Sequence, residues 1–583
     1  MVKKFYITTA IDYVNARPHI GHAFEKVIAD ALARWKRQKN VKTWFLTGTD
    51  ENAQKNAQVA KEKGIPVKKF VDANSKIFIE LCEKLNISND DFIRTTEERH
   101  TRTAKEIFKK VYEKGEIYKG AYEGWYCVGC EEFKTEKNLV NGSCPEHHTK
   151  PEWISEEAYF FKLSKYKNKL VEFVKNYIVP ESKRNEILSR LKNEELRDLC
   201  VSRKNLDWGI DSPIDKKYKI YVWFDALINY ISGANGNWPA DVHIVGKGIN
   251  WFHSVIWPAI LISAGYKLPK TLLVHGYLNL KGQKISKSLG NVIDPLELIE
   301  KYGVDSVRYS LFRCSVFEDS DYSEEILIER NNNELANKLG NLVSRVSGLI
   351  EKNGVVKTQN SLIKKLNEKK INGLMERFEF DKALNEIFSF VDVCNQYVQD
   401  KKPWETNDKK ILFELKESIL KIADLLWPFI PSSSEKIKEC FSKPKIIKSE
   451  ILFRKIEVEE KVIKEEKIEG VMTNVSFSEW EKLDLRVAKI LKAEDIEGAD
   501  KLYRLSLDVG KEIGKRTICA GIKPYYSKDE LKNKKIIVFA NLEPRKIKGI
   551  ESQGMLLAAS TSNHGKVILL TVEKDIETGS KVG

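Results

Sequence analysis

The first forty residues change from one hydrophobic pattern to another. An apolar, β-branched run over residues 5–11 predicts a buried strand. Asn15 and Pro18 are turn signals that end this run. Apolar residues then recur at helical spacing, at Ala23, Val27, Ala31 and Leu32. The pattern predicts a strand, a tight turn and a helix that begins near His19. This is the first half of a βαβ unit, in which ligands bind at the carboxyl ends of the strands.

Strand and helix patterns keep alternating over the first 325 residues. Further strands are expected over residues 41–51, 91–95, 243–248 and 271–274. Residues 221–230 are interpreted as an aromatic-rich strand running into a helix, and residues 250–258 as the start of an aromatic-rich helix. The alternation on both sides of residues 117–218 predicts a doubly wound, Rossmann-type parallel sheet that carries an insertion.

The pattern changes after residue 325. Helical spacing without strand signals predicts an α-helical bundle over residues 326–442. Residues 443–474 are rich in both charges, with few apolar positions, and are interpreted as a linker or solvated helix. Period-two apolar segments then predict an all-β domain over residues 475–583. Its expected strands are residues 484–493, 502–509, 515–520, 535–540 and 554–559.

The chain is therefore expected to be a multidomain α/β protein. Its predicted parts are residues 1–116 and 219–325 for the two halves of the sheet, 117–218 for the insertion with a zinc knuckle at 125–150, 326–442, 443–474 and 475–583. A length of 583 residues exceeds one hydrophobic core. The composition, 42% hydrophobic and 31% charged, is that of a globular protein, and the net charge of +14 suits a polyanionic partner. With no signal peptide and no membrane span recognised, a cytoplasmic location is expected.

Two segments carry candidate phosphate chemistry. His19 and His22 flank Gly21 at the predicted helix start, where unpaired N–H groups and the helix dipole favour phosphate. Two capping histidines without a ligand are the alternative. Residues 281–291 form a basic loop whose lysines and hydroxyls can clamp a triphosphate, through Lys284, Ser286, Lys287 and Ser288. Alone, this loop is more typical of a solvated basic surface.

Further polar and aromatic residues follow strands that share one edge of the predicted sheet. Asp50 ends the second strand and can hold a substrate ammonium; the alternative is a cap for a helix over residues 53–63. An aromatic set suits a flexible thioether, because sulfur packs well against rings. This set comprises Tyr13, Trp223, Tyr230, Phe252 and His253. Ordinary core packing is the alternative for each of them.

Cysteine spacing points to a metal. Cys127 and Cys130 form one knuckle, and Cys144 and His147 form a second after thirteen intervening residues. Three thiolates and one imidazole predict a closed, tetrahedral, structural zinc site. His148 is the alternative fourth ligand, and a redox-active cysteine pair is the alternative to zinc.

Candidate RNA-contacting residues lie in the helical region. Asn341 and Arg345 are four residues apart on one helix face, and Trp404 follows a proline. Amide, guanidinium and indole groups can bond to and stack on the bases of an RNA loop. Ordinary helix polarity and a half-buried tryptophan are the alternatives.

Together, the His19-Ile20-Gly21-His22 and Lys284-Ile285-Ser286-Lys287-Ser288 segments resemble the two signature motifs of class I aminoacyl-tRNA synthetases. Residues 8–22, 47–51, 221–230 and 251–258, with the single zinc-knuckle pair, narrow the resemblance to the methionyl-tRNA synthetase family. Segments within residues 485–555 resemble the tRNA-binding OB-fold domain that ends many bacterial members.

The resemblance implies ATP-dependent activation of methionine and its transfer to tRNA(Met), for translation initiation and elongation. It implies catalytic roles for His19, His22, Lys284 and Lys287, with Arg203 helping to position ATP or the reacting carboxylate. It adds Ile11 and Leu227 to the methionine pocket and makes Asn341, Arg345 and Trp404 the anticodon readers. The implied cofactors are one structural Zn²⁺ and Mg²⁺ with ATP. A homodimer through the C-terminal domain is also implied.

Five positions depart from the usual pattern of that family: Ala10, Asp12, Leu227, Gly248 and Ile285. They concern substrate affinity more than reaction type, because both histidines and both lysines are kept. Three rival functions are a small adenylyltransferase, a non-catalytic RNA-binding relative and a class I synthetase for another amino acid. The helical and β domains argue against an adenylyltransferase, which needs neither. The intact histidine and lysine motifs argue against a non-catalytic relative. The insertion is too small for an editing domain, and the aromatic set suits methionine. Both argue against a synthetase for another amino acid.

Overall fold

We describe the fold from a computed structural model. The structure describes residues 4–127, 132–134, 139–140, 142–145, 149–204, 206–280, 283–284, 292–457, 480–560 and 566–582. The chain divides into two compact units, Met1–Glu459 and Glu460–Gly583. Each unit is described by itself.

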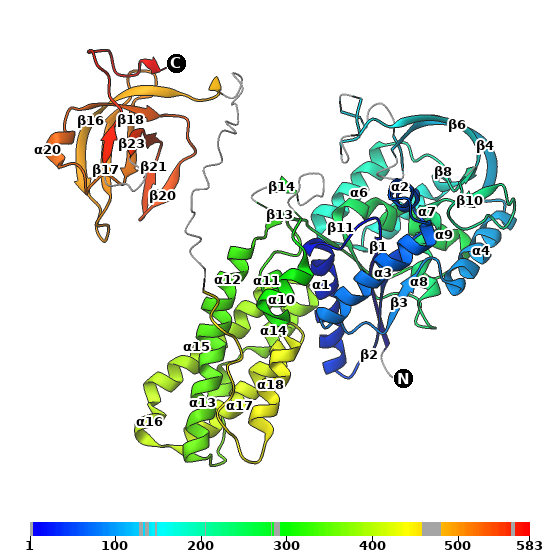
Figure 1. Cartoon of the computed structure of the whole chain (residues 1–583), viewed down its shortest axis with the longest axis horizontal. Coiled ribbons are helices and arrows are strands. Elements are labelled where there is room, and N and C mark those ends of the chain that lie inside the picture. The colour runs from blue at the N-terminus through cyan, green and yellow to red at the C-terminus, as the bar shows by residue number, and fades with distance from the viewer. Residues whose placement is uncertain are drawn as a thin grey trace. The chain divides into compact units, whose positions relative to one another are not determined.

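A six-stranded parallel sheet forms the centre of the first unit (Figure 1). Its strands, in spatial order, are β3 (Asp91–Arg94), β2 (Lys42–Asp50), β1 (Lys4–Tyr13), β11 (Val242–Gly246), β12 (Leu272–His275) and β7 (Ile178–Val179). All five pairings are parallel. The predicted Rossmann-type sheet is confirmed. Chain order reverses beside β1, and such a switch point opens a crevice at the carboxyl ends of the strands.

Helices connect and follow the strands of this sheet. They are α1 (Ile20–Gln38), α2 (Gln54–Glu62), α3 (Val67–Lys84), α4 (Glu98–Glu113), α7 (Val222–Leu227), α8 (Asn229–Ser232), α9 (Trp257–Ala264), α10 (Pro295–Tyr302) and α11 (Val304–Phe312). Helix α1 begins one residue after His19, as the sequence predicts, and its last turn carries Lys36 and Arg37 near the negative end of the helix dipole. It is buried along most of its length, so it places the residues that follow β1 firmly against the sheet.

One predicted strand is wrong, although the helix predicted to follow it is confirmed. Residues 221–230 form no strand: after the short β10 (Tyr218–Ile220), helix α7 begins at Val222 and α8 at Asn229. Aromatic and β-branched residues favour strands by propensity, but burial on every side overrides that preference. All six residues of α7 are buried.

The insertion contains a four-stranded antiparallel sheet. Its strands, in spatial order, are β5 (Glu132–Lys134), β4 (Ile117–Cys127), β6 (Glu152–Phe161) and β8 (Leu199–Cys200). The remaining elements are η2 (Leu163–Tyr166), α5 (Lys167–Val174), α6 (Glu181–Asn193) and the β9 (Ser202–Lys204)–β10 pair. Strand β7, within the predicted insertion, pairs with β12 and so belongs to the central sheet.

Residues 324–442 contain helices and no strand. They are α12 (Glu324–Arg330), the π-helical η6 (Asn331–Gly340), α13 (Asn341–Asn353), η7 (Leu362–Lys365), α14 (Glu368–Glu376), α15 (Phe380–Lys401), α16 (Pro403–Thr406), α17 (Lys409–Leu426) and α18 (Pro431–Ser442). The long helices α13, α15, α17 and α18 pack side by side (Figure 1). Their apolar faces share one core with α1 and α11, so this helical array and the sheet form a continuous hydrophobic interior.

The first half of the predicted linker is not free. Residues 443–457 contain no helix and pack along the helices through the buried side chains of Ile446 and Phe453. Asn332 accepts a hydrogen bond from the Ile456 amide at 2.9 Å, and the Ser449 amide donates to the hydroxyl of Ser347 at 2.9 Å. The two apolar side chains and these hydrogen bonds hold this segment against the helices. Its charged composition had predicted a solvated linker.

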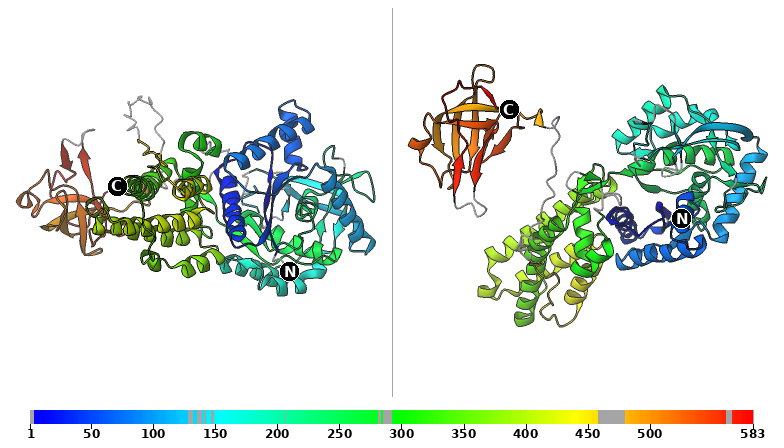
Figure 2. Two further views of the ribbon diagram at one scale, coloured as in Figure 1. Left: turned by 90° about the horizontal axis from the view of Figure 1, so that it is seen from below. Right: turned by 45° about the horizontal axis from the view of Figure 1, so that its top comes forward.

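The second unit is a nearly closed antiparallel barrel (Figure 2). Its main strands are β16 (Leu485–Asp495), β17 (Tyr503–Asp508), β18 (Lys515–Ala520), β19 (Lys535–Phe539), β22 (Met555–Leu556) and β25 (Lys581–Val582). The short pairs β20 (Arg545–Ile547)–β21 (Ile550–Ser552) and β23 (Ala558–Ser560)–β24 (Val567–Leu569) complete it. Tyr503, Leu505 and Leu507 alternate inward along β17, which confirms the predicted period-two pattern.

Across the described parts of both units, the helices are either too short or too polar to cross a bilayer.

Candidate active site

A cavity of about 360 Å³ opens at the carboxyl end of β1 and the start of α1. Ten residues predicted from the sequence for catalysis, ATP or methionine line it. They are Ile11, Tyr13, His19, Gly21, His22, Asp50, Trp223, Leu227, Tyr230 and His253. These residues lie up to 242 positions apart in the sequence, from Ile11 to His253, and the parallel sheet brings them together at one edge.

The two histidines cap helix α1 reciprocally. His19 is the N-cap, and its Nδ1 accepts a hydrogen bond from the Gly21 amide at 3.1 Å. The His19 amide in turn donates to Nδ1 of His22 at 2.9 Å. The two rings lie side by side, with centroids 3.8 Å apart. The arrangement replaces the usual capping carboxylate and hydroxyl with two imidazoles, so the cap and the candidate catalytic groups are the same residues.

These contacts determine which ring nitrogen carries the proton. A nitrogen that accepts a hydrogen bond from an amide holds a lone pair, so Nδ1 of both His19 and His22 is unprotonated. The proton of each neutral imidazole then lies on Nε2. The cavity is therefore supplied with two N–H donors beside the positive end of a helix dipole, a combination suited to phosphate oxygens.

Gly21 is required by this geometry. A Cβ atom at Gly21 would lie 2.9 Å from Cε1 of His19, closer than carbon atoms approach without a shift. Any side chain would therefore push the His19 ring out of its capping position.

The other end of the cavity is aromatic. Trp223 lines the cavity and stacks on Phe252, with ring centroids 3.6 Å apart and an interplanar angle of 14°. Tyr13 meets the Trp223 ring edge-on at 6.2 Å. Phe252 is outside the lining, so it supports Trp223 from behind, and a direct contact with methionine stays a prediction.

Tyr230 and His253 form a neutral polar pair in this wall. Nδ1 of His253 faces the Ile249 carbonyl at 2.9 Å and so carries the ring proton; its Nε2 accepts a hydrogen bond from the Tyr230 hydroxyl at 2.7 Å. Burial lowers the pKa of His253 to about 4 and raises the pKa of Tyr230 well above its ordinary value. The pair is uncharged at neutral pH, and His253 lies in the π-helical η4 (Phe252–Ile256), which sets its direction.

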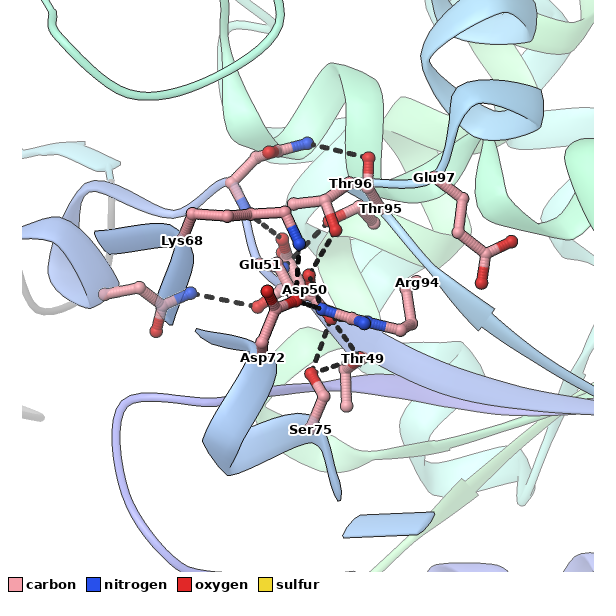
Figure 3. A network of polar contacts seen from close by, with 12 residues as sticks. Thr49, Asp50, Glu51, Lys68, Asp72, Ser75, Arg94, Thr95, Thr96 and Glu97 are labelled. Atoms are coloured by element: carbon pink, nitrogen blue, oxygen red, sulfur yellow. Dashed lines mark hydrogen bonds and ion pairs between the residues drawn. The ribbon is translucent and has the colours of Figure 1, made fainter. Parts of the chain in front are cut away.

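Asp50 is the only carboxylate among the ten residues, and it is 2% exposed. It lies in a network of hydrogen bonds and ion pairs (Figure 3). Its neighbour Glu51 is fully buried and receives two hydrogen bonds from Arg94, at 2.6 and 2.9 Å. Arg94 also bonds to Asp72. Helix α2 is capped by Ala53, without a side-chain bond, so the alternative that Asp50 caps this helix is wrong.

The lining residues that the sequence interpretation did not assign to the site include Glu25, Asn229, His275 and Tyr277. Glu25 accepts a hydrogen bond from the Ala10 amide at 2.8 Å and contacts Nε2 of His275 at 3.0 Å. Glu25 and His275 are 250 residues apart, so no local pattern links them. The only usable signal was that Glu25 follows His22 by three positions and shares its helix face.

The remaining ATP candidates are incompletely described. Arg203 lies on β9, outside the cavity lining, with its guanidinium over the Tyr126 ring at 4.3 Å. Lys284 belongs to β14 (Gln283–Lys284) and pairs with Asn279 on β13 (Leu278–Leu280). The neighbouring residue Leu278 lines the cavity. The backbone of Lys284 thus lies near the cavity. Ser286, Lys287 and Ser288 lie outside the described residues, as does the departure at Ile285.

Half of the predicted metal site is described. Cys127 ends β4 and is 1% exposed; Cys144 is fully buried, and its amide donates to the Thr149 carbonyl at 2.9 Å. Cys130 and His147, with the alternative His148, lie outside the described residues. Among the residues that are described, no three metal-ligating side chains gather. Two buried thiols in a segment with few apolar residues fit the donor set that zinc requires.

The anticodon candidates lie on two helices. Asn341 and Arg345 are exposed at the start of α13, and Trp404 on α16 is 42% exposed. An indole this exposed on a helical domain is available for stacking.

Comparison with known proteins identifies relatives over the whole length. The chain matches the family "tRNA synthetases class I (M)" over residues 5–151 and 146–347, "Anticodon-binding domain of tRNA ligase" over 359–496 and "Putative tRNA binding domain" over 485–581. It is 44% identical to the methionine–tRNA ligase of Caldanaerobacter subterraneus subsp. tengcongensis over 100% of both chains. It is 41% identical to that of Thermotoga maritima, over 99% of this chain and 100% of the other.

Solved structures agree. Mycobacterium tuberculosis methionyl-tRNA synthetase in complex with methionyl-adenylate matches with a TM-score of 0.72 and 38% identity, over 75% of this chain and 94% of the other. Its apo form matches with a TM-score of 0.66 and 35% identity, over 76% and 92% of the two chains.

Proposed function

Because the chain belongs to the methionyl-tRNA synthetase family of class I ligases, we propose that the cavity at the start of α1 activates methionine through His19 and His22. The chain is a methionine–tRNA ligase: it joins methionine to AMP at the expense of ATP and then to tRNA. The proposal concerns which of its residues do this work.

In the first step, a methionine carboxylate oxygen attacks the α-phosphate of ATP. A new O–P bond forms, the bond to the β-phosphate oxygen breaks, and pyrophosphate leaves with the electron pair. Nε2–H of His19 and of His22 donate to the phosphate oxygens as their charge builds. Lys284 and Lys287 hold the leaving pyrophosphate, and Mg²⁺ would supply further positive charge when it is bound with ATP. No covalent intermediate with the protein is required.

In the second step, a ribose hydroxyl of the terminal tRNA adenosine attacks the methionyl carbonyl carbon, and AMP leaves. The protein contributes mainly position and charge in both steps. Arg203 is proposed to steady ATP or the reacting carboxylate.

The aromatic end of the cavity is proposed to bind methionine. The Asp50 carboxylate, which lines the cavity, pairs with the substrate ammonium through a charge-assisted hydrogen bond. The thioether packs against Trp223, Tyr13 and Leu227, between rings that tolerate its flexible shape. The neutral Tyr230–His253 pair adds polarity without charge, which favours an uncharged side chain.

The reciprocal cap, which leaves the proton of each ring on Nε2 and holds both histidines in the lining of one cavity, is the observation that carries this proposal. The test is amino-acid-dependent ATP–pyrophosphate exchange with each standard amino acid in turn. Exchange with methionine alone, lost in His19→Ala and Lys287→Ala, is expected. Exchange that both substitutions leave unchanged would refute the mechanism.

We further propose one structural Zn²⁺ bound by Cys127, Cys130, Cys144 and His147. When bound, it supplies a cross-link to a segment with few apolar residues and no chemistry of its own. Metal analysis of the purified chain should give one zinc per chain, with loss of zinc in Cys144→Ser. If His147→Ala keeps the zinc and His148→Ala loses it, the fourth ligand is His148 and not His147.

Recognition of tRNA is proposed to use two regions. Asn341, Arg345 and Trp404 read the anticodon loop of tRNA(Met); Trp404 lies within the anticodon-binding match over residues 359–496, and Asn341 and Arg345 precede it. The barrel binds tRNA without sequence preference, and we propose that it also forms a homodimer, which light scattering of the full chain would test. The cytoplasmic location stays a prediction.

A further inference from the structure

The cavity wall contains a carboxylate that the mechanism does not use. Asp12, near the end of β1, is 8% exposed and lines the cavity. Its Oδ2 lies 2.5 Å from Nζ of Lys26, on the second turn of α1. Lys26 is fully buried and is not among the lining residues. The ammonium therefore lies behind Asp12, where neither water nor substrate reaches it.

This pair is directed at one of the two phosphate-binding histidines. The other carboxylate oxygen of Asp12, Oδ1, lies 4.0 Å from Nε2 of His22. Nε2 carries the His22 proton, because Nδ1 accepts the His19 amide. A negative oxygen beyond this N–H favours its present direction. The order from the cavity inward is thus imidazole, carboxylate and ammonium.

A carboxylate in this place has a cost for the reaction. ATP brings several negative charges to the same histidines, and like charges repel strongly where water is excluded. A neutralising cation is therefore needed close to Asp12. Burial raises the pKa of Asp12, and Lys26 opposes that rise. Burial lowers the pKa of Lys26, but Asp12, Cys82 and Glu25 together raise it above its ordinary value, so Lys26 stays protonated at neutral pH.

We propose that Lys26 is a positioning residue for ATP: it neutralises Asp12, so that Asp12 can orient His22 without repelling the phosphates. The inference rests on the proposed function of His22 and adds a buried charge pair behind it. If the inference is correct, loss of the Lys26 charge should affect the binding of one substrate more than the other. ATP is an anion, whereas methionine is a zwitterion without net charge, so a lone carboxylate at Asp12 weakens ATP binding far more than methionine binding.

The test measures the KM values for ATP and methionine by pyrophosphate exchange in Lys26→Met. We expect the KM for ATP to rise on the order of tenfold, with the KM for methionine within threefold of wild type. Adding Asp12→Asn to this variant removes the orphan carboxylate, and the KM for ATP should return to within threefold of wild type. Lys26→Gln keeps a hydrogen-bond donor without the charge and serves if Lys26→Met does not fold.

Asp30→Asn is the matched control. Asp30 is a fully buried carboxylate on the same helix, paired with Arg308 at 2.6 Å and not among the cavity-lining residues. It should lower thermal stability without changing either KM. His22→Asn separates the two hypotheses, because an unchanged KM for ATP in that variant would refute the phosphate role of His22 itself.

Equal increases in both KM values for Lys26→Met would overturn the inference and show a structural role only. ATP binding that stays weak in the double variant Asp12→Asn/Lys26→Met would overturn it too, as would ATP binding that neither Lys26 variant affects.

Discussion

The two units of the chain treat charge in opposite ways. The first unit buries charged side chains close to its cavity, among them Asp12, Glu25, Lys26, Asp50 and Glu51. In the barrel, the described residues bury no charged side chain, and Ser552 is the one buried polar residue among them. Its core is formed by apolar side chains such as Leu505 and Ile536.

We attribute the difference to what each unit is proposed to bind. Chemistry on a phosphate needs charges and donors fixed in direction before the substrate arrives, and burial provides that at a cost in solvation. Weak, sequence-independent contact with an RNA backbone needs only exposed cations. Substitution of a charge should therefore damage folding or catalysis in the first unit, and only RNA affinity in the barrel.

The largest effect is expected at His19. Removal of a donor that stabilises transition-state charge costs about 10²–10³ in rate, so His19→Ala should reduce methionine-dependent pyrophosphate exchange by that factor. It also removes the cap of α1, worth about 1 kcal/mol of stability. His19→Asn is the matched control, because asparagine caps well but has no imidazole: stability should return and the rate should not. Recovery of the rate would contradict the catalytic role.

Breaking a buried ion pair should come next. Arg94→Met leaves the fully buried Glu51 without its bidentate partner and should cost about 3 kcal/mol in the free energy of unfolding. The comparison variant is Lys492→Met in the barrel, which breaks an exposed pair with Glu494 and should change nothing measurable. Urea unfolding checks both. Equal effects would remove the contrast between the units.

Asp50→Asn should impair methionine binding alone. Loss of a charge-assisted hydrogen bond to the substrate ammonium costs up to about 3 kcal/mol, which corresponds to a KM for methionine raised by roughly 100-fold. The KM for ATP should stay within threefold. A larger change for ATP than for methionine would assign Asp50 to the nucleotide.

Acid should destabilise the first unit selectively. Burial lowers the pKa of His100 to about 3 and that of His253 to about 4, against 6.5 in the unfolded chain. Below pH 6.5 the unfolded chain binds protons that the folded chain does not, so stability falls as pH falls. Each histidine should remove about 2 kcal/mol between pH 7.5 and 5.

Hydrogen exchange measured segment by segment would check this pH effect. Protection of α4 and α9 should fall with acid, while β17–β19 of the barrel, which contain no histidine, should keep theirs. His100→Gln should remove its share of the slope. A slope that does not change in this variant would contradict the assignment.

The smallest effect is expected on the barrel surface. Arg545, Lys546 and Lys548 are exposed on and beside the β20–β21 pair. Lys546→Ala should weaken tRNA binding severalfold and reduce the salt dependence by about one phosphate contact. Pyrophosphate exchange should be unaffected. A loss of exchange would show that the barrel takes part in adenylation.

Local sequence signals predicted the part of the site whose structure depends on neighbouring residues in the sequence. The turn residues and helical spacing predicted the start of α1 within one residue, and with it the position of His19 and His22 at the N-terminus of the helix. Contacts between distant segments were out of reach. Asp12 was noted as a departure, but its pairing with Lys26 depends on how β1 packs against α1, and Glu25 with His275 depends on β12.

Predictions from residue propensity and composition were wrong for two segments whose structure is set by tertiary packing. Residues 221–230 have strand-forming side chains but form helices α7 and α8, because the cavity wall buries them all round. Residues 443–457 have the composition of a linker, yet Ile446 and Phe453 anchor them in the helical core. Two well-placed apolar side chains outweighed a charged average.

The measurement that tests this account most directly compares the full chain with a chain ending at Glu457. If catalysis depends on buried charges of the first unit alone, both should show the same rate and KM values in methionine-dependent pyrophosphate exchange. Only the full chain should then keep a low KM for tRNA in aminoacylation. A shortened chain that folds but loses exchange would contradict the division between the two units.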